Sequence, residues 1–149
     1  MAEAFEVLGI MTDEGRKRQN EMYATGKSFK VTHFTVTSKG HDPDDTKVPL
    51  APDPLIAGDE ASDVGGLVDL TAISGQGYAE GTQCPWFTCL LQKGFGTGEV
   101  SQIILFAEIV YSPTVDDPEL NTKFAFAVAN HGMKTKTALD EFSVKFGLY

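Results

Sequence analysis

The sequence predicts a mainly β (α+β) fold, an antiparallel β-sandwich of about six strands with one N-terminal helix and long Pro/Asp loops. The composition supports this, because 15 glycines and 10 phenylalanines suit turns and pleated strands better than a helical bundle. Residues 103–111 are apolar on both faces apart from Glu108, which is typical of a strand covered on both sides. Near the end of the chain, apolar residues alternate with period two, as in a half-buried strand. These alternating residues are Phe142, Val144, Phe146 and Leu148.

The length of 149 residues fits a single domain spanning residues 1–149. We expect residues 1–11 to form an N-terminal arm. A helix is predicted over residues 12–26, because the Thr12 hydroxyl can cap its first turn and Gly26 can end it. Few of its residues are apolar, so we expect it to lie on the surface, docked by one edge.

A β core is predicted over residues 27–149. Its first strand is followed by a long loop over residues 38–63, where four prolines bar a regular ladder. Residues 94–98 are rich in glycine and favour a hairpin turn, and residues 130–137 form a polar connection between the last two strands. The predicted strands span residues 28–37, 66–74, 86–92, 100–111, 123–129 and 141–149.

The formal net charge of -9 excludes several kinds of partner. An acidic surface repels phosphate, so we expect no binding of nucleic acid. No apolar run approaches the roughly 20 residues that span a bilayer, so we expect no membrane insertion. The acidic N-terminus does not resemble a secretory signal, which predicts synthesis in a cytoplasm. We therefore expect Cys84 and Cys89 to be reduced, and their odd spacing turns them to opposite faces of a strand.

Catalytic and metal-binding patterns are absent from the sequence. The three histidines, His33, His41 and His131, fall in a strand, a loop and a turn, without a nucleophile elbow or a zinc-protease motif. We therefore expect no enzyme, no cofactor and no metal. The acids of the long loop could gather around calcium, but residues 42–45 lack the spacing of a calcium-binding loop, which favours a solvated acidic loop.

Four segments together resemble the N-terminal attachment domain of phage tail fibre and tail-collar proteins. Residues 12–16 open the helix like the T-x-x-G segment of that family, and residues 30–37 resemble its strand with a central Thr-His pair. Residues 100–107 are similar to its I-x-E-I-G-L-F strand, and residues 124–130 to its A-V-A-N strand. This sequence departs from the family at Thr37-Ser38, Gln102 and Ile104, which replace Gly, Glu and Gly.

The resemblance implies a structural protein of the virion tail, made in the host cytoplasm, that acts as an adaptor joining a tail fibre or another component to the baseplate. It also implies a homo-oligomer, commonly a trimer. Residue 149 stands where a fibre would continue into a shaft and a receptor-binding tip, so the resemblance does not imply receptor binding by this chain alone. One candidate contact is the loop over residues 42–63, for which a disordered loop is the alternative. The other candidates are five apolar residues, for which self-packing or, for the tryptophan, a core or rim position is the alternative. These five are Phe5, Val7, Leu8, Ile10 and Trp86.

Two other functions fit parts of the sequence. A small carbohydrate-binding β-sandwich module would present aromatic residues such as Trp86, Tyr78 and Phe95 on one open face. An inhibitor that mimics nucleic acid would gather its acids in one patch, whereas the acids here are scattered over loops.

Overall fold

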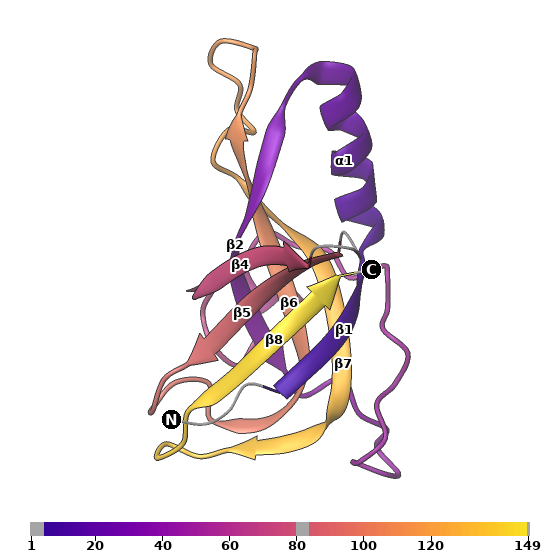
Figure 1. Cartoon of the computed structure of the whole chain (residues 1–149), viewed down its shortest axis with the longest axis vertical. Coiled ribbons are helices and arrows are strands. Elements are labelled where there is room, and N and C mark those ends of the chain that lie inside the picture. The colour runs from indigo at the N-terminus through magenta and orange to yellow at the C-terminus, as the bar shows by residue number, and fades with distance from the viewer. Residues whose placement is uncertain (1–4, 80–83, 149) are drawn as a thin grey trace.

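The computed structural model describes residues 5–79 and 84–148, which form one mixed sheet of eight strands and one α-helix (Figure 1). The mainly β prediction is confirmed, but the strands of this sheet number eight instead of six, and the sheet curves into a half-barrel instead of forming a sandwich. The helix is α1 (Asp13–Thr25), and a 3-10 helix, η1, spans Ala61–Val64. The strands are β1 (Phe5–Met11), β2 (Ser28–Thr37), β3 (Thr71–Ala72), β4 (Gly75–Ala79), β5 (Cys84–Leu91), β6 (Gly98–Tyr111), β7 (Lys123–Lys136) and β8 (Phe142–Leu148).

The helix forms as the sequence predicts. The Thr12 side chain accepts a hydrogen bond from the amide of Gly15 at 2.9 Å, and Gly26 ends α1 in the left-handed conformation with φ of 76°. Gly15 is the buried residue of α1, and an added Cβ there would lie 2.5 Å from the Phe126 carbonyl oxygen. The helix therefore docks on β7 by one narrow edge.

The predicted N-terminal arm is instead an internal strand of the sheet. The order is β3-β2-β6-β7-β1-β8-β5-β4, so β1 lies between β7 and β8. Its first half pairs with β8 in parallel, from Phe5 opposite Val144 to Gly9 opposite Leu148. Its last two residues, Ile10 and Met11, pair with β7 in the antiparallel direction. Residues 1–4 of the predicted arm and residue 149 of the last predicted strand lie outside the described residues.

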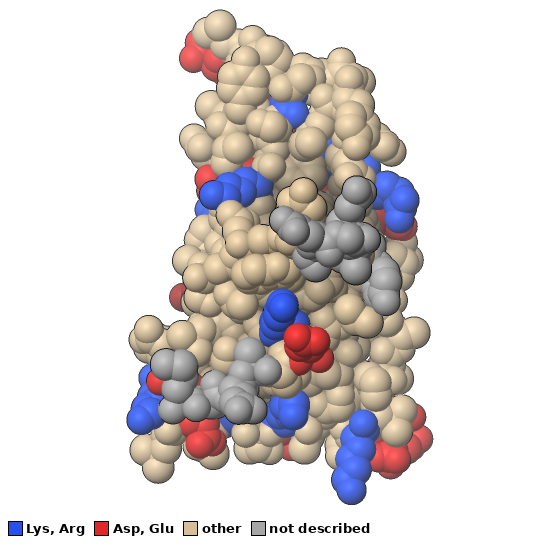
Figure 2. Space-filling model, viewed as in Figure 1, with Lys and Arg blue, Asp and Glu red and all other residues tan. Residues whose placement is uncertain are grey.

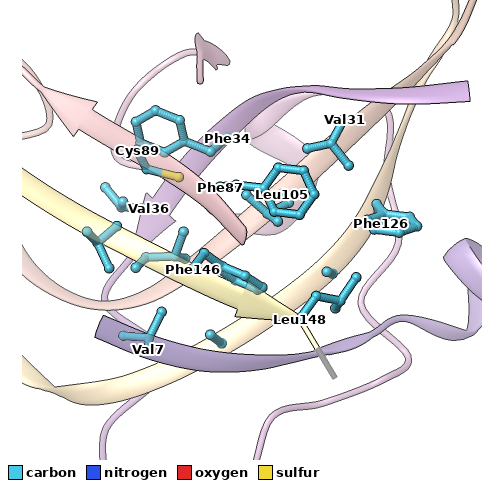
Figure 3. Packing of buried hydrophobic residues seen from close by; sticks show 14 of the residues in the cluster. Val7, Val31, Phe34, Val36, Phe87, Cys89, Leu105, Phe126, Phe146 and Leu148 are labelled. Carbon is cyan, nitrogen blue, oxygen red and sulfur yellow. The ribbon is translucent and has the colours of Figure 1, made fainter. Parts of the chain in front are cut away.

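The main core fills the concave side of the half-barrel. In Figure 1, β4, β5, β8 and β1 curve in front of β2, β6 and β7. Figure 3 shows apolar side chains from both halves meeting between them. Burial of these side chains supplies the main driving force for folding. Labelled examples are Val7, Phe87, Phe146 and Leu148 from the front strands, and Val31, Phe34, Val36 and Leu105 from the back strands.

The long loop covers the outer face of β7. Its backbone carbonyls accept hydrogen bonds from three points along the strand, the amides of Ala125 and Met133 and the side-chain amide of Asn130. A second apolar cluster lies under the loop, where Ile56 packs against it. The polar connection expected at residues 130–137 is mostly strand, because β7 continues to Lys136 and the carbonyl of Thr46 in the loop accepts the Met133 hydrogen bond at 2.7 Å.

Of the strand predicted over residues 66–74, only Thr71 and Ala72 form a strand, β3, and β4 begins just beyond it at Gly75. β3 pairs with β2, whereas β4 pairs with β5 at the other end of the sheet. Between them, the Ile73 amide donates to the Thr32 carbonyl at 3.0 Å and the Ser74 amide donates to the Thr88 carbonyl at 2.8 Å. The two terminal strands of the half-barrel are therefore joined by only two residues.

Candidate functional site

One row of residues crosses the outer surface of the front strands. Leu8 on β1 and Trp86 on β5 both pair with Gly147 on β8, and Trp86 also pairs with Gly77 on β4. Because Gly147 has no side chain, a depression of about 410 Å³ lies between Leu8 and Trp86. The indole ring covers Gly77, where an added Cβ would lie 2.6 Å from Trp86 Cζ2. We call this surface the Leu8–Trp86 face, made of Glu6, Leu8, Cys84, Pro85, Trp86, Lys145 and Gly147.

The charge on the Leu8–Trp86 face is balanced. Lys145 lies 3.9 Å from the carboxylate of Glu6, and its ammonium stands 5.1 Å from the centre of the Trp86 ring. Both charged side chains are well exposed, so the pair adds little stability. In Figure 2, a basic patch and an acidic patch lie side by side near the middle of this view. Leu8 is 63% exposed, so the face presents apolar surface to solvent.

Two of the five predicted contact residues, Leu8 and Trp86, thus lie together on the surface. The other three pack within their own chain. Phe5 contacts the rings of Phe142 and His131, with centroids 5.2 and 5.1 Å away. Val7 belongs to the main core, and Ile10 packs on the second cluster beneath the long loop.

The three aromatic residues expected for a carbohydrate module do not share one face. Tyr78 pairs with Pro85, the residue before Trp86. The side chains of Tyr78 and Trp86 therefore lie on opposite sides of the sheet. Phe95 belongs to the turn before β6 and lines a separate depression with Leu90. Trp86 is therefore the aromatic residue of this set on the Leu8–Trp86 face.

The segments that carry the family resemblance meet in space. Thr12 and Gly15 begin the helix, and both reach β7. The Thr12 hydroxyl donates to the Ala125 carbonyl at 2.7 Å while it caps the helix. The motif residues at the start of α1 thus position the helix on the strand that contains the A-V-A-N segment.

Two of the departures from the family pattern contact each other. The Thr37 hydroxyl donates to the Gln102 side-chain oxygen at 2.7 Å, and the Gln102 amide group donates to Asn130 at 2.9 Å. Asn130 in turn donates to the carbonyl of Leu50 in the long loop at 3.0 Å. This chain of hydrogen bonds, which is buried at Thr37 and Gln102, connects β2, β6, β7 and the loop. These two departures from the family pattern therefore stabilise the fold.

The histidines lie on different elements, where the His33 ring contacts the Thr32 hydroxyl and the His131 ring contacts the Gly132 carbonyl, each at 2.7 Å. His33 and His131 both have a lowered pKa, chiefly because burial disfavours the charged ring. His41 contacts the Ser101 hydroxyl at 2.8 Å, but Ser101 is fully buried and also accepts a hydrogen bond from the Gly40 amide. This pair positions the start of the long loop on β6.

The cysteines face opposite ways, as their spacing predicts. Cys84 lines the Leu8–Trp86 face, whereas Cys89 is buried in the main core. Burial raises the pKa of the Cys89 thiol to about 12, so it stays protonated at neutral pH.

Within residues 5–79 and 84–148, no three His, Cys, Asp or Glu side chains are grouped so that they could hold a metal ion. The same part of the chain has no helix of the length and apolarity that crossing a membrane requires. Comparison with family models, with curated proteins and with solved structures gives no match.

Proposed function

We propose that this chain is a structural component of a phage tail, an adaptor that attaches a tail fibre or another component to the baseplate. The main support for the proposal is that the segments resembling the attachment domains contact one another in the fold. Thr12 and Gly15 at the start of α1 contact β7, and β6 pairs with both β2 and β7. Four short segments, scattered along the sequence, thus form one structural unit, which supports a common origin with the attachment domains that they resemble.

The Leu8–Trp86 face is the proposed contact with another tail protein. It combines an exposed leucine, a half-buried tryptophan and a depression above Gly147. Aromatic anchors beside such depressions are typical of the centres of protein interfaces. The neutralised pair of Glu6 and Lys145 leaves no net charge that a partner would have to match.

Incorporation into particles tests the adaptor role. Purified virions from cells that encode this chain are expected to contain it, as measured by mass spectrometry. Leu8→Glu should reduce its incorporation at least tenfold with an unchanged thermal unfolding midpoint, because a buried charge in the interface is costly. Leu139→Glu is the matched control, since Leu139 is 83% exposed and lies outside the face. Recovery of the chain only in the soluble fraction would contradict the proposal.

The proposed trimer has a separate test. Light scattering should give the mass of three chains for the purified protein. Deletion of residues 1–11 is unsuitable for this purpose, because it removes β1 from the middle of the sheet. A monomer at micromolar concentration would contradict the trimer. The adaptor role is tested separately, by the incorporation experiment.

A further inference from the structure

A second depression, which we call the lysine pocket, lies where β7 ends and β8 begins. Its volume is about 440 Å³. Three of the 12 basic residues of the chain line it, Lys93, Lys134 and Lys136, together with the acids Asp140 and Glu141. Three positive and two negative side chains give a local charge of +1, in a chain whose net charge is -9.

Lys136 is the unusual member of the lysine pocket. It is only 2% exposed, and its ammonium makes one long hydrogen bond of 3.5 Å, to the carbonyl of Thr137. No ion pair within residues 5–79 and 84–148 involves Lys136. A buried ammonium that no anion contacts directly is costly, because it has lost its water shell. A bound anion would supply the missing partner.

The nearest acid of the pocket is already engaged. Asp140 accepts hydrogen bonds from the Thr137 hydroxyl at 2.7 Å and from the Thr137 amide at 3.4 Å. These bonds lower the pKa of Asp140 and hold its carboxylate in the turn between β7 and β8. The charge of Lys136 also lowers the pKa of Asp140, but among the described residues the two side chains form no ion pair, so the Lys136 ammonium can still bind an anion from outside the chain.

The opposite side of the pocket is apolar and fixed. The Lys134 ammonium stands 4.6 Å from the centre of the Phe5 ring. Phe5 in turn packs edge to face against Phe142, which also lines the pocket. The ring of Phe5 is therefore held in place between a cation and the core, as an aromatic wall beside the lysines.

We propose that the lysine pocket binds a small organic carboxylate, with the carboxylate between Lys134 and Lys136 and the apolar part of the ligand against Phe5. The volume is in the range of small-molecule sites, and the lining combines an apolar wall with a few charged groups. This inference goes beyond the adaptor role and does not depend on it, since the lysine pocket and the Leu8–Trp86 face share no residue.

Titration of the isotope-labelled full chain with phenylacetate, followed by NMR, tests the proposal. The backbone amide signals of Thr135 and Ser143, which line the pocket, should shift and saturate. Phenylacetamide, the neutral match, should leave these signals unchanged, and inorganic phosphate should bind more weakly because it lacks the apolar part. Absence of saturable shifts with phenylacetate, or equal binding of phenylacetamide, would overturn the proposal.

Substitution of Lys134 and Lys136 tests whether these two side chains bind the carboxylate. Lys136→Met keeps the shape of the side chain and should weaken phenylacetate binding at least tenfold, the factor expected for a lost charged hydrogen bond. Lys134→Met should also weaken it, and this exposed position gives a second test if the first variant fails to fold. Lys17→Met is the control, because Lys17 lies on α1 outside the pocket. Unchanged affinity in both pocket variants would overturn the assignment.

Discussion

Phe146 lies against Gly9 at the point where β1 changes its partner from β8 to β7. A Cβ added to Gly9 would lie 2.1 Å from Cζ of Phe146 and 2.9 Å from the carbonyl oxygen of Val128. The close approach lets one strand join the front and back halves of the half-barrel around a buried ring.

Gly9→Ala should therefore lower the free energy of unfolding by about 1–3 kcal/mol, the usual cost of overpacking a core. Denaturant-induced unfolding measures the change. Gly147→Ala is the matched control on the neighbouring strand, because its new Cβ would first meet the end of the Leu8 side chain at 3.2 Å. An equal loss in both variants would show that the space beside Phe146 is not the cause.

Thr12 combines a helix cap with a tertiary hydrogen bond. Thr12→Val keeps the volume but removes the hydroxyl that binds Gly15 and Ala125. The loss should be about 1–2 kcal/mol in the free energy of unfolding. Thr12→Ser, which retains the hydroxyl, should lose less. The opposite order of the two variants in urea unfolding would contradict this role.

Gln102 is buried and is the central member of the chain of hydrogen bonds from Thr37 to Leu50. Gln102→Leu would leave the Thr37 hydroxyl and the Asn130 side-chain oxygen without this partner. We expect destabilisation by about 1–3 kcal/mol, measured by thermal and denaturant unfolding. The control is Gln92→Leu, at an exposed position, and it should change stability by less than about 0.5 kcal/mol.

His131 should make the protein less stable in acid. Its pKa in the folded protein is lowered from 6.5, because burial disfavours the charged ring, although its bond to the Gly132 carbonyl acts in the opposite direction. The unfolded chain therefore binds a proton more readily, so this stability is present above about pH 6.5 and is lost as the pH falls below it. The positive charge of Lys134 strengthens the effect.

His131→Phe removes this titration and should flatten the decrease in unfolding free energy between about pH 7.5 and pH 5. The ring nitrogen Nε2 of His131 is buried without a hydrogen bond, so the substitution removes an unsatisfied polar atom as well. His33→Gln is a useful comparison, since His33 is the other histidine with a lowered pKa. Parallel pH profiles for wild type and His131→Phe would contradict the prediction.

Local signals predicted α1 and most of the strands. Thr12 and Gly26 delimit the helix because caps depend on neighbouring residues alone. The place of β1 could not be predicted, because its parallel pairing depends on β8 at the far end of the chain. Likewise, β7 continues past Asn130 because a distant loop supplies the hydrogen-bond partner of Met133, which the polar sequence there does not reveal.

The positions of the candidate sites were harder to predict, because they depend on the register of the strand pairs. Leu8 and Trp86 stand out in the sequence as apolar residues, but their meeting across Gly147 follows from two strand pairings that no local pattern specifies. The burial of Lys136 is also unexpected, since the sequence around it is polar and resembles a solvated turn. In the sequence of β1, only Glu6 and Gly9 interrupt a run of apolar residues, so no period-two alternation marked it as a strand.

The parallel pairing of β1 with β8 also affects how the protein is made. During translation, Phe5 leaves the ribosome long before Val144, the residue that it pairs with. The growing polypeptide must therefore carry the apolar side of β1 without its neighbour, at risk of aggregation or capture by chaperones, until synthesis reaches β8. Premature termination before β8 would remove the strand that lies between β1 and β5. The sheet can therefore form completely only after translation has reached Leu148.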